Sequence, residues 1–113
     1  MTRGDVVLVD WTYSDRTGSK LRPAVVVQAD FLNHFFDDTV LVAITTTARH
    51  VPGTEVVLDP AAETSSGLHA VCVASCNNFL TIDQALIDQT IGLLSKAAMS
   101  QIAAQLKAVL ALV

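Results

Sequence analysis

The sequence predicts a small, mainly β protein, an antiparallel barrel or sandwich that ends in one α-helix. Short runs rich in valine and threonine recur at close spacing along the first 82 residues. No long helical pattern interrupts them, and a helical repeat of apolar residues begins only after residue 95. A chain of 113 residues is about as long as one domain, so we expect a single domain over residues 1–113.

The expected strands are the apolar runs that turn-forming residues separate. Residues 5–11 (DVVLVDW) form the first run, and the polar stretch 12–20 after it predicts an exposed loop. Pro23 lacks a backbone N–H and therefore suits the first residue of the second strand, 23–28. The segment 29–36 (ADFLNHFF) is equally consistent with a helical turn and with a loop. The remaining strands are expected at residues 39–47, 54–58, 67–75 and 78–82.

The C-terminal segment changes to a helical period. Ser95 stands where an N-cap hydroxyl would accept from the first free N–H groups, which predicts a helix of about 17 residues. Its apolar stripe is Met99, Ile102, Ala103, Leu106, Val109, Leu110 and Val113. The opposite face carries Ala97, Ala104, Ala108 and Ala111 and has little charge. We therefore expect that this helix could lie between the barrel and a second protein.

Composition narrows the classes of partner. Hydrophobic residues make up 51% of the chain and charged residues only 16%, so some apolar surface should meet a partner. The most apolar segment, 97–113, contains polar residues and is shorter than the ~20 residues of a membrane-spanning helix. Residues 1–10 carry two aspartates and lack a small-residue cleavage site, unlike a signal peptide. We expect a cytoplasmic protein without a membrane anchor.

Cysteines and histidines give no sign of a disulfide or a metal site. Cys72 and Cys76 would lie about 13 Å apart on one strand, too far to bridge, so reduced thiols are expected. His34, His50 and His69 stand far apart without ligand spacing and are expected in loops or on the surface. We therefore expect neither a metal nor another cofactor.

Arg22 stands directly before Pro23 and the valine run. One interpretation is a loop arginine that extends over the end of a strand. However, Pro23 fixes its backbone, and Arg16 and Lys20 stand on the same loop in a chain with only seven lysines and arginines. A rigidly held guanidinium suits phosphate binding, because its planar fork matches two phosphate oxygens.

Two further groups of polar residues follow strands. Thr45, Thr46 and Thr47 are typical strand formers, but their hydroxyls can also donate to phosphoryl oxygens, and Arg49 adds charge beside them. In the segment 75–83 (SCNNFLTID), Asn77 and Asn78 are typical of a turn between two strands. They could equally bind a base edge or a ribose.

Four segments, in order, resemble the MazF/PemK (Kid) group of toxin endoribonucleases: residues 3–10 (RGDVVLVD), 18–28 (GSKLRPAVVVQ), 43–45 (AIT) and 75–83. The resemblance extends over nearly the whole chain, and R-G-D with an apolar strand followed by R-P-x-V-V-V is quite specific. It implies an SH3-like β-barrel shared with the CcdB toxins, usually a homodimer. It also implies an mRNA interferase that cuts single-stranded RNA, and a cognate antitoxin whose disordered tail covers the RNA site.

The resemblance assigns the catalytic positions to Arg22, before the proline, and Thr45, at the end of the third main strand. The implied reaction needs no metal: the RNA 2′-OH attacks the adjacent phosphorus and leaves a 2′,3′-cyclic phosphate and a 5′-OH end. Arg22 and Thr45 suit charge stabilisation, but arginine, with a pKa above ~12, is a poor base. The sequence offers no convincing general base, so we expect a slow enzyme. The expected RNA contacts are Arg16, Lys20, Thr46, Thr47, Arg49, Asn77 and Asn78.

The chain departs from a second pattern in the same family. One branch carries R-C-D before the strand that begins TID, and a histidine after the glycine of the first loop. Here Ser75, Cys76 and Asn77 take the first three places and Ser19 takes the fourth. The aspartate-based scheme therefore cannot operate as described, and only the version with arginine and threonine remains.

Charge leaves an alternative open. A net charge of −4 and a pI near 5.0 argue against broad nucleic-acid affinity, although five of the seven cations precede residue 50 and could form a local basic groove. The alternative is a non-catalytic protein that binds a protein target, as CcdB binds gyrase, or a degenerate homologue that only sequesters antitoxin. The departures at residues 19, 75 and 77 favour the alternative, and the retained Arg22 and Thr45 favour the ribonuclease.

Overall fold

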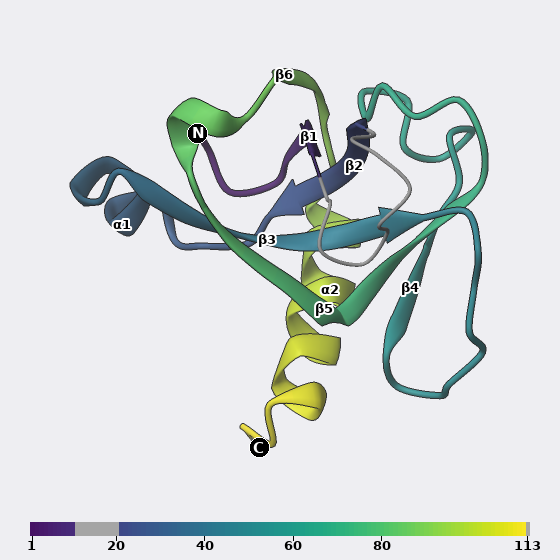
Figure 1. Ribbon diagram of the computed structural model, residues 1–113. Helices are drawn as coiled ribbons and strands as arrows, with labels where there is room; N and C mark the ends of the chain where they lie inside the picture. Colours follow the sequence, from purple (N-terminus) through teal and green to yellow (C-terminus); the bar gives the residue numbers. More distant parts are fainter. Residues whose placement is uncertain (11–20, 113) are drawn as a thin grey trace.

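The computed structural model describes residues 1–10 and 21–112 and contains one curled antiparallel sheet (Figure 1). The strands are β1 (Asp5–Asp10), β2 (Leu21–Val26), β3 (Asp38–Thr45), β4 (Glu55–Leu58), β5 (Cys72–Asp83) and β6 (Gln89–Leu93). Their order across the sheet is β4-β5-β3-β2-β1-β6, and the sheet curls into a half-barrel. The helices are α1 (Asp30–Phe35), the 3-10 helix η2 (Gln84–Leu86) and α2 (Lys96–Val109). The mainly β architecture with one C-terminal helix is confirmed.

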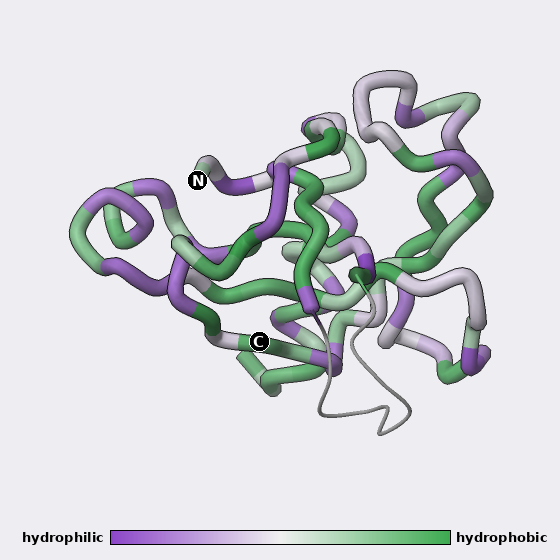
Figure 2. The backbone as a smooth tube through the Cα atoms, turned by 45° about the horizontal axis from the view of Figure 1, so that its top comes forward, coloured by the Kyte–Doolittle hydropathy of each residue, from purple (hydrophilic) through white to green (hydrophobic). Residues whose placement is uncertain are grey.

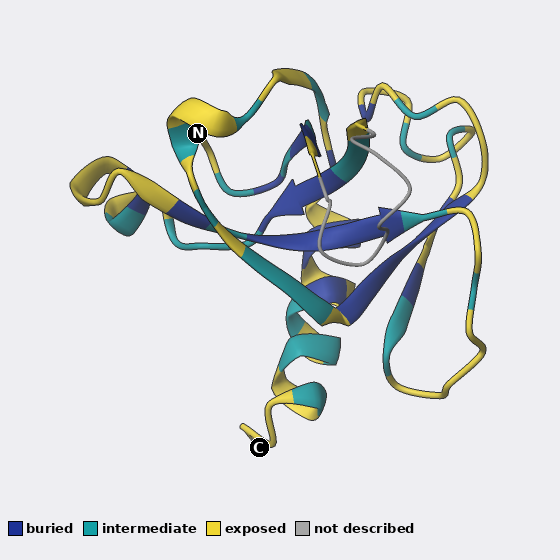
Figure 3. Ribbon diagram, viewed as in Figure 1, coloured by how far each residue is buried: buried dark blue, intermediate teal, exposed yellow. Residues whose placement is uncertain are grey.

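The two faces of the sheet carry two separate cores, because side chains alternate along each strand. On one face, Val6, Val25 and Val42 pack with Met99 and Ile102 of α2. The other face carries a smaller core of Val7, Val9, Ala24, Val26, Leu41 and Ala43. Buried residues are concentrated at 24–26 of β2, 41–44 of β3 and 72–76 of β5 (Figure 3). The strands that later frame the site are therefore held from both faces.

Helix α2 begins as predicted and ends earlier than predicted. The Ser95 hydroxyl accepts a hydrogen bond from the Ala98 N–H at 3.0 Å and donates to Glu63 Oε2 at 2.7 Å. The helix has 14 residues instead of about 17. Ala111 adopts a left-handed φ of 55°, and the N–H of Leu112 reaches back to the Lys107 carbonyl at 2.7 Å, a Schellman ending that stops the helix.

Strand β5 corrects the prediction of two strands at 67–75 and 78–82. Residues 72–83 form one strand, and residues 67–71 precede it as a loop. In the ladder with β3, Val42 pairs with Phe79 while Ala43 pairs with Ser75, so residues 76–78 are extra on the β5 side. The two asparagines therefore lie in a bulge, which bends the strand sharply without reversing it (Figure 1).

Strand β6 was not predicted. Its sequence, QTIGL, has little alternation and contains Gly92, a residue that is disfavoured inside strands. The structure explains the glycine: a Cβ at residue 92 would lie 2.3 Å from the backbone of Ser65 and Ser66. The ambiguous segment 29–36 contains the short helix α1.

Cys72 and Cys76 are both free and buried, as expected for reduced thiols. Within residues 1–10 and 21–112, no helix has both the length and the apolar character needed to cross a bilayer.

Candidate active site

The β2–β3 ladder ends before the two strands end. The last pair is Ala24 with Ala43, whereas β2 begins at Leu21 and β3 continues to Thr45. Continuing the same register places Arg22 opposite Thr45, on the sheet face of the Ala24–Ala43 pair. The two strands thus leave an opening at this end of the sheet.

Pro23 lies inside β2 and not at its first residue, where we predicted it. Its position is still compatible with the missing N–H, because β2 there pairs with β1 through Leu8 but not yet with β3. The proline thus lies directly before the last residue of β2 that pairs with β3, at the point where the opening begins.

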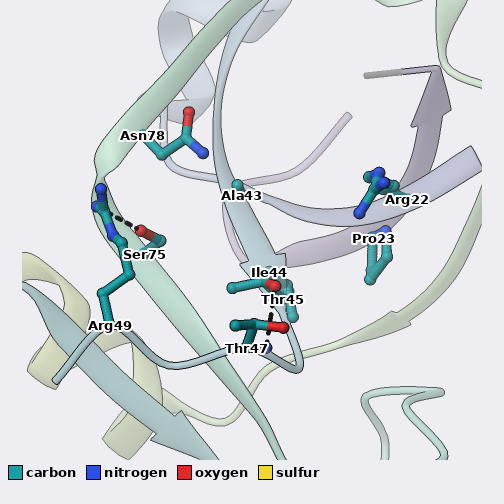
Figure 4. Close-up of a pocket in the computed structure, with 9 residues that line it drawn as sticks. All are labelled: Arg22, Pro23, Ala43, Ile44, Thr45, Thr47, Arg49, Ser75 and Asn78. Carbon is teal, nitrogen blue, oxygen red and sulfur yellow. Dashed lines mark hydrogen bonds between the residues drawn. The ribbon is translucent and has the colours of Figure 1, made fainter. Parts of the chain in front are cut away.

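The opening is a pocket of about 540 Å³ (Figure 4). Residues of β2, of β3 with the segment directly after it, and of β5 surround it, so three separate stretches of the sequence meet there. The lining residues are Arg22, Pro23, Ala43, Ile44, Thr45, Thr47, Arg49, Ser75 and Asn78.

Thr45 is held at the rim by its own chain. Its Oγ1 accepts a hydrogen bond from the backbone N–H of Thr47 at 3.1 Å. Because the N–H supplies that proton, the hydroxyl proton of Thr45 stays available as a donor. Thr45 is half-buried, and Thr47 lines the pocket beside it.

Arg49 enters the pocket from the side of β5. Its Nη2 donates to Ser75 Oγ at 3.3 Å and to Asn77 Oδ1 (Figure 4 shows the bond to Ser75). Ser75 is buried and Asn77 is exposed. The guanidinium therefore connects a buried residue of β5 with an exposed residue at the bend of this strand. Ser75 and Asn77 are also two of the positions at which the sequence departs from R-C-D.

A carboxylate fixes the backbone beneath Arg49. Glu55, at the start of β4, accepts from the N–H of Arg49 at 2.7 Å and from the N–H of His50 at 3.0 Å. His50 has a left-handed φ of 58°, which turns two successive N–H groups toward one acceptor. The Glu55 side chain therefore binds the backbone of this turn.

The pocket is cationic in a protein with a net charge of −4. Its described lining contains two arginines and no carboxylate, imidazole or amine. The nearby Cys76 is not an available nucleophile, because burial and the negative charge of Glu55 raise its pKa from 9.0 to about 11. Among residues 1–10 and 21–112, no group of three or more histidine, cysteine, aspartate or glutamate side chains is placed to hold a metal.

The structure brings most of the predicted site residues together. Arg22, Thr45, Thr47, Arg49 and Asn78 share the pocket. Thr46 is exposed and is not part of the lining, and Asn77 joins the group through Arg49. Arg16 and Lys20 lie outside the described residues. The catalytic and RNA-binding roles of all these residues stay predictions.

Ser75 was missed as a site residue. The sequence marked it only as a departure from R-C-D. Its alternation with Ala74 and Cys76, which are buried on the α2 face, places Ser75 on the pocket face. That signal becomes readable only once the register of β5 is known.

Comparison with known proteins finds a matching family model and solved structures of similar fold. The family model of "PemK-like, MazF-like toxin of type II toxin-antitoxin system" matches residues 2–110. A mycobacterial endoribonuclease solved with its cognate antitoxin is 25% identical, with a TM-score of 0.82 over 100% of this chain and 97% of that chain.

Two other structures share the fold at lower identity. The Mycobacterium tuberculosis toxin MazF-mt6 is 23% identical, with a TM-score of 0.77 over 95% of this chain and 96% of that one. A MazE-MazF structure from Deinococcus radiodurans is 18% identical, with a TM-score of 0.77 and coverage of 98% and 96%. No curated protein sequence matches the chain.

Proposed function

The chain belongs to the family of PemK-like, MazF-like toxins of type II toxin-antitoxin systems, and on that premise we propose that it is a metal-independent endoribonuclease that cuts single-stranded RNA. The proposal extends to one toxin domain over residues 1–113, of which the family model covers residues 2–110. A mycobacterial relative of the same fold is itself an endoribonuclease, which supports the class of reaction.

The observation that carries the proposal is that Arg22 and Thr45 line one pocket. A guanidinium and a hydroxyl on the same side of a cleft can donate to the same phosphodiester. Two residues on separate strands would have no shared substrate if they pointed to opposite ends of the molecule. Their convergence therefore favours a ribonuclease over a degenerate homologue that has lost its site.

The reaction that fits these groups is transesterification within the RNA. The 2′-oxygen attacks the adjacent phosphorus, the bond from phosphorus to the 5′-oxygen breaks, and the products are a 2′,3′-cyclic phosphate and a 5′-OH end. Arg22 and Thr45 donate to the phosphoryl oxygens, where negative charge accumulates in the transition state. They also hold the phosphate for in-line attack.

Proton transfer is left to solvent in this scheme. The described lining of the pocket offers no carboxylate or imidazole to take the proton of the 2′-OH. Water accepts that proton, and water supplies one to the departing 5′-oxygen. Such an enzyme gains its rate from binding and charge stabilisation alone, and we expect it to be slow.

We also propose a cognate antitoxin as the protein partner, a homodimer as the assembly and the cytoplasm as the location. The mycobacterial relative was solved with its antitoxin, which supports the first. Exposed apolar positions at the end of α2 support the second: Leu110 is 51% exposed and Leu112 is 60% exposed. Figure 2 shows green, hydrophobic colour along the described residues that follow α2.

The test is cleavage of single-stranded RNA by the purified protein in EDTA, beside Arg22→Ala. We expect cuts that end in a 2′,3′-cyclic phosphate and a 5′-OH with the wild type, and a large loss with the variant. Circular dichroism of Arg22→Ala checks that the fold is intact.

Lys107→Ala is the matched control, because it also removes a cation. Lys107 is exposed on α2, which packs on the other face of the sheet. Equal background cleavage by wild type and Arg22→Ala would end the ribonuclease proposal. Growth arrest on induction without RNA loss would then favour a protein target.

A further inference from the structure

Two arginines reach the pocket from opposite sides of β3. Arg22 comes from β2, which pairs with one edge of β3, whereas Arg49 lies against Ser75 of β5, which pairs with the other edge. Two strand spacings, roughly 10 Å, therefore separate β2, which carries Arg22, from β5, against which the guanidinium of Arg49 lies. Thr45 and Thr47 lie between the arginines in the same pocket (Figure 4).

Among the described residues, uncharged side chains hold the guanidinium of Arg49 in place. Both acceptors of its Nη2, Ser75 Oγ and Asn77 Oδ1, are uncharged. Glu55 is the nearby carboxylate, and it is bonded to the backbone N–H groups of Arg49 and His50. Within the described residues, the Arg49 side chain has its hydrogen bonds through Nη2, which leaves its Nη1 and Nε donors for a ligand.

Resting on the proposed function, we propose that Arg49 is a second substrate-contacting cation that binds the RNA phosphate next to the scissile one. The sugar-phosphate backbone then crosses the end of β3, with the scissile phosphate at Arg22 and Thr45 and its neighbour at Arg49. Asn77 acts as a positioning residue that fixes the guanidinium.

A phosphate is the ligand that this geometry favours. The pocket has a charge of +2 from its described lining, and an oxyanion is the group that a fixed guanidinium binds most strongly. A guanidinium can also donate to O6 and N7 of guanine, but affinity would then depend on the presence of that base. The phosphate contact that we propose should be independent of sequence.

The salt dependence of binding tests this, because each phosphate contact to a single strand contributes about −0.7 to the slope of log affinity against log salt. The probe is a fluorescent single-stranded 2′-O-methyl RNA of mixed sequence, which cannot undergo attack by the 2′-oxygen. Affinities are measured by anisotropy over a series of salt concentrations. Cleavage of unmodified RNA by the wild type is measured in parallel.

We expect Arg49→Gln to bind more weakly and with a slope less steep by about 0.7, as for Arg22→Gln. Arg49→Lys should keep the slope and lose about tenfold in affinity, because it keeps the charge without the fork. Asn77→Ala should also keep the slope and lose affinity. Lys107→Gln is the control and should match the wild type in both.

Different outcomes separate this inference from the proposed function. If the wild type cuts RNA but Arg49→Gln keeps the full slope, Arg49 does not contact a phosphate and the inference is wrong. An equal slope change in Lys107→Gln would show a general charge effect and also overturn it. If the wild type neither binds nor cuts RNA, the proposed function fails as well. Should Arg49→Gln unfold, undiminished affinity in both Arg49→Lys and Asn77→Ala would overturn the inference.

Discussion

Arg22 of β2 and Thr45 of β3 lie opposite each other, two positions beyond the last pair of the β2–β3 ladder. Each residue still pairs with the strand on its other side: Arg22 pairs with Val9 of β1, and Thr45 pairs with Val73 of β5. The space between them is open, yet both backbones belong to paired strands. A rigid opening of this kind holds two donors ready for a substrate without ordering a loop.

Replacement of Arg22 by lysine tests whether the planar fork matters or only its charge. Arg22→Lys keeps a cation at the rim but loses paired donation to two phosphate oxygens. Loss of one donor to a developing charge costs about 2.7–4 kcal/mol, so we expect single-turnover cleavage to slow by roughly 10²–10³-fold. The melting temperature should change little. Cleavage at the wild-type rate would show that Arg22 acts only through long-range attraction.

Thr45→Val removes the hydroxyl while keeping the shape of the side chain. We expect cleavage to slow by roughly 10²-fold, because the donor to the phosphoryl oxygen is lost. The Thr47 N–H loses its acceptor, but Thr47 is exposed and water can replace it, so unfolding should become easier by at most about 1 kcal/mol. Thr45→Ser is the matched control and should stay within several-fold of the wild type.

The sequence predicted the parts of the fold that local patterns determine. Valine-rich runs marked β1 to β4, and Ser95 marked the start of α2. The single strand β5 was not predictable, because two adjacent asparagines favour a turn and a bulge alike. Only the ladder with β3, in which Phe79 and Ser75 meet neighbouring residues, decides between the two.

The candidate site was also predicted only in part. Arg22 and Thr45 came from the resemblance, and the structure places them in one pocket. The contact of Arg49 with Ser75 joins residues 26 apart in sequence, one in the segment after β3 and the other on β5, and no local pattern predicts such a contact. The departures at Ser75 and Asn77 from R-C-D favoured a homologue that has lost its site. In the structure, both side chains instead accept hydrogen bonds from the guanidinium of Arg49.

Ser95→Ala tests the start of α2. The variant removes the N-cap acceptor of the Ala98 N–H and a donor to Glu63, so we expect a loss of about 1 kcal/mol in the free energy of unfolding. Urea denaturation at neutral pH measures it. Ser100→Ala is the control within the same helix, because Ser100 is exposed and alanine is the better helix former. Equal stability of the two variants would contradict the cap.

The pKa of Cys76 predicts how stability varies at high pH. Burial and then the charge of Glu55 raise it from 9.0 to about 11 in the folded state, while the unfolded thiol keeps its ordinary value. Between these two values the unfolded chain has lost the proton and the folded chain still holds it. The contribution of this thiol to the free energy of unfolding is therefore fully present below about pH 9. It is lost progressively as the pH rises toward 11.

Comparison with Cys76→Ala isolates this effect, because the other groups that titrate at high pH are present in both proteins. The alanine variant starts from a lower free energy of unfolding, since it leaves a small cavity in the core on the α2 face. We expect the difference between wild type and variant, measured by urea denaturation, to shrink steadily from pH 8 to pH 10.5. A difference that stays constant over this range would mean that the thiol titrates alike in the folded and unfolded chains, and that neither burial nor Glu55 affects its proton.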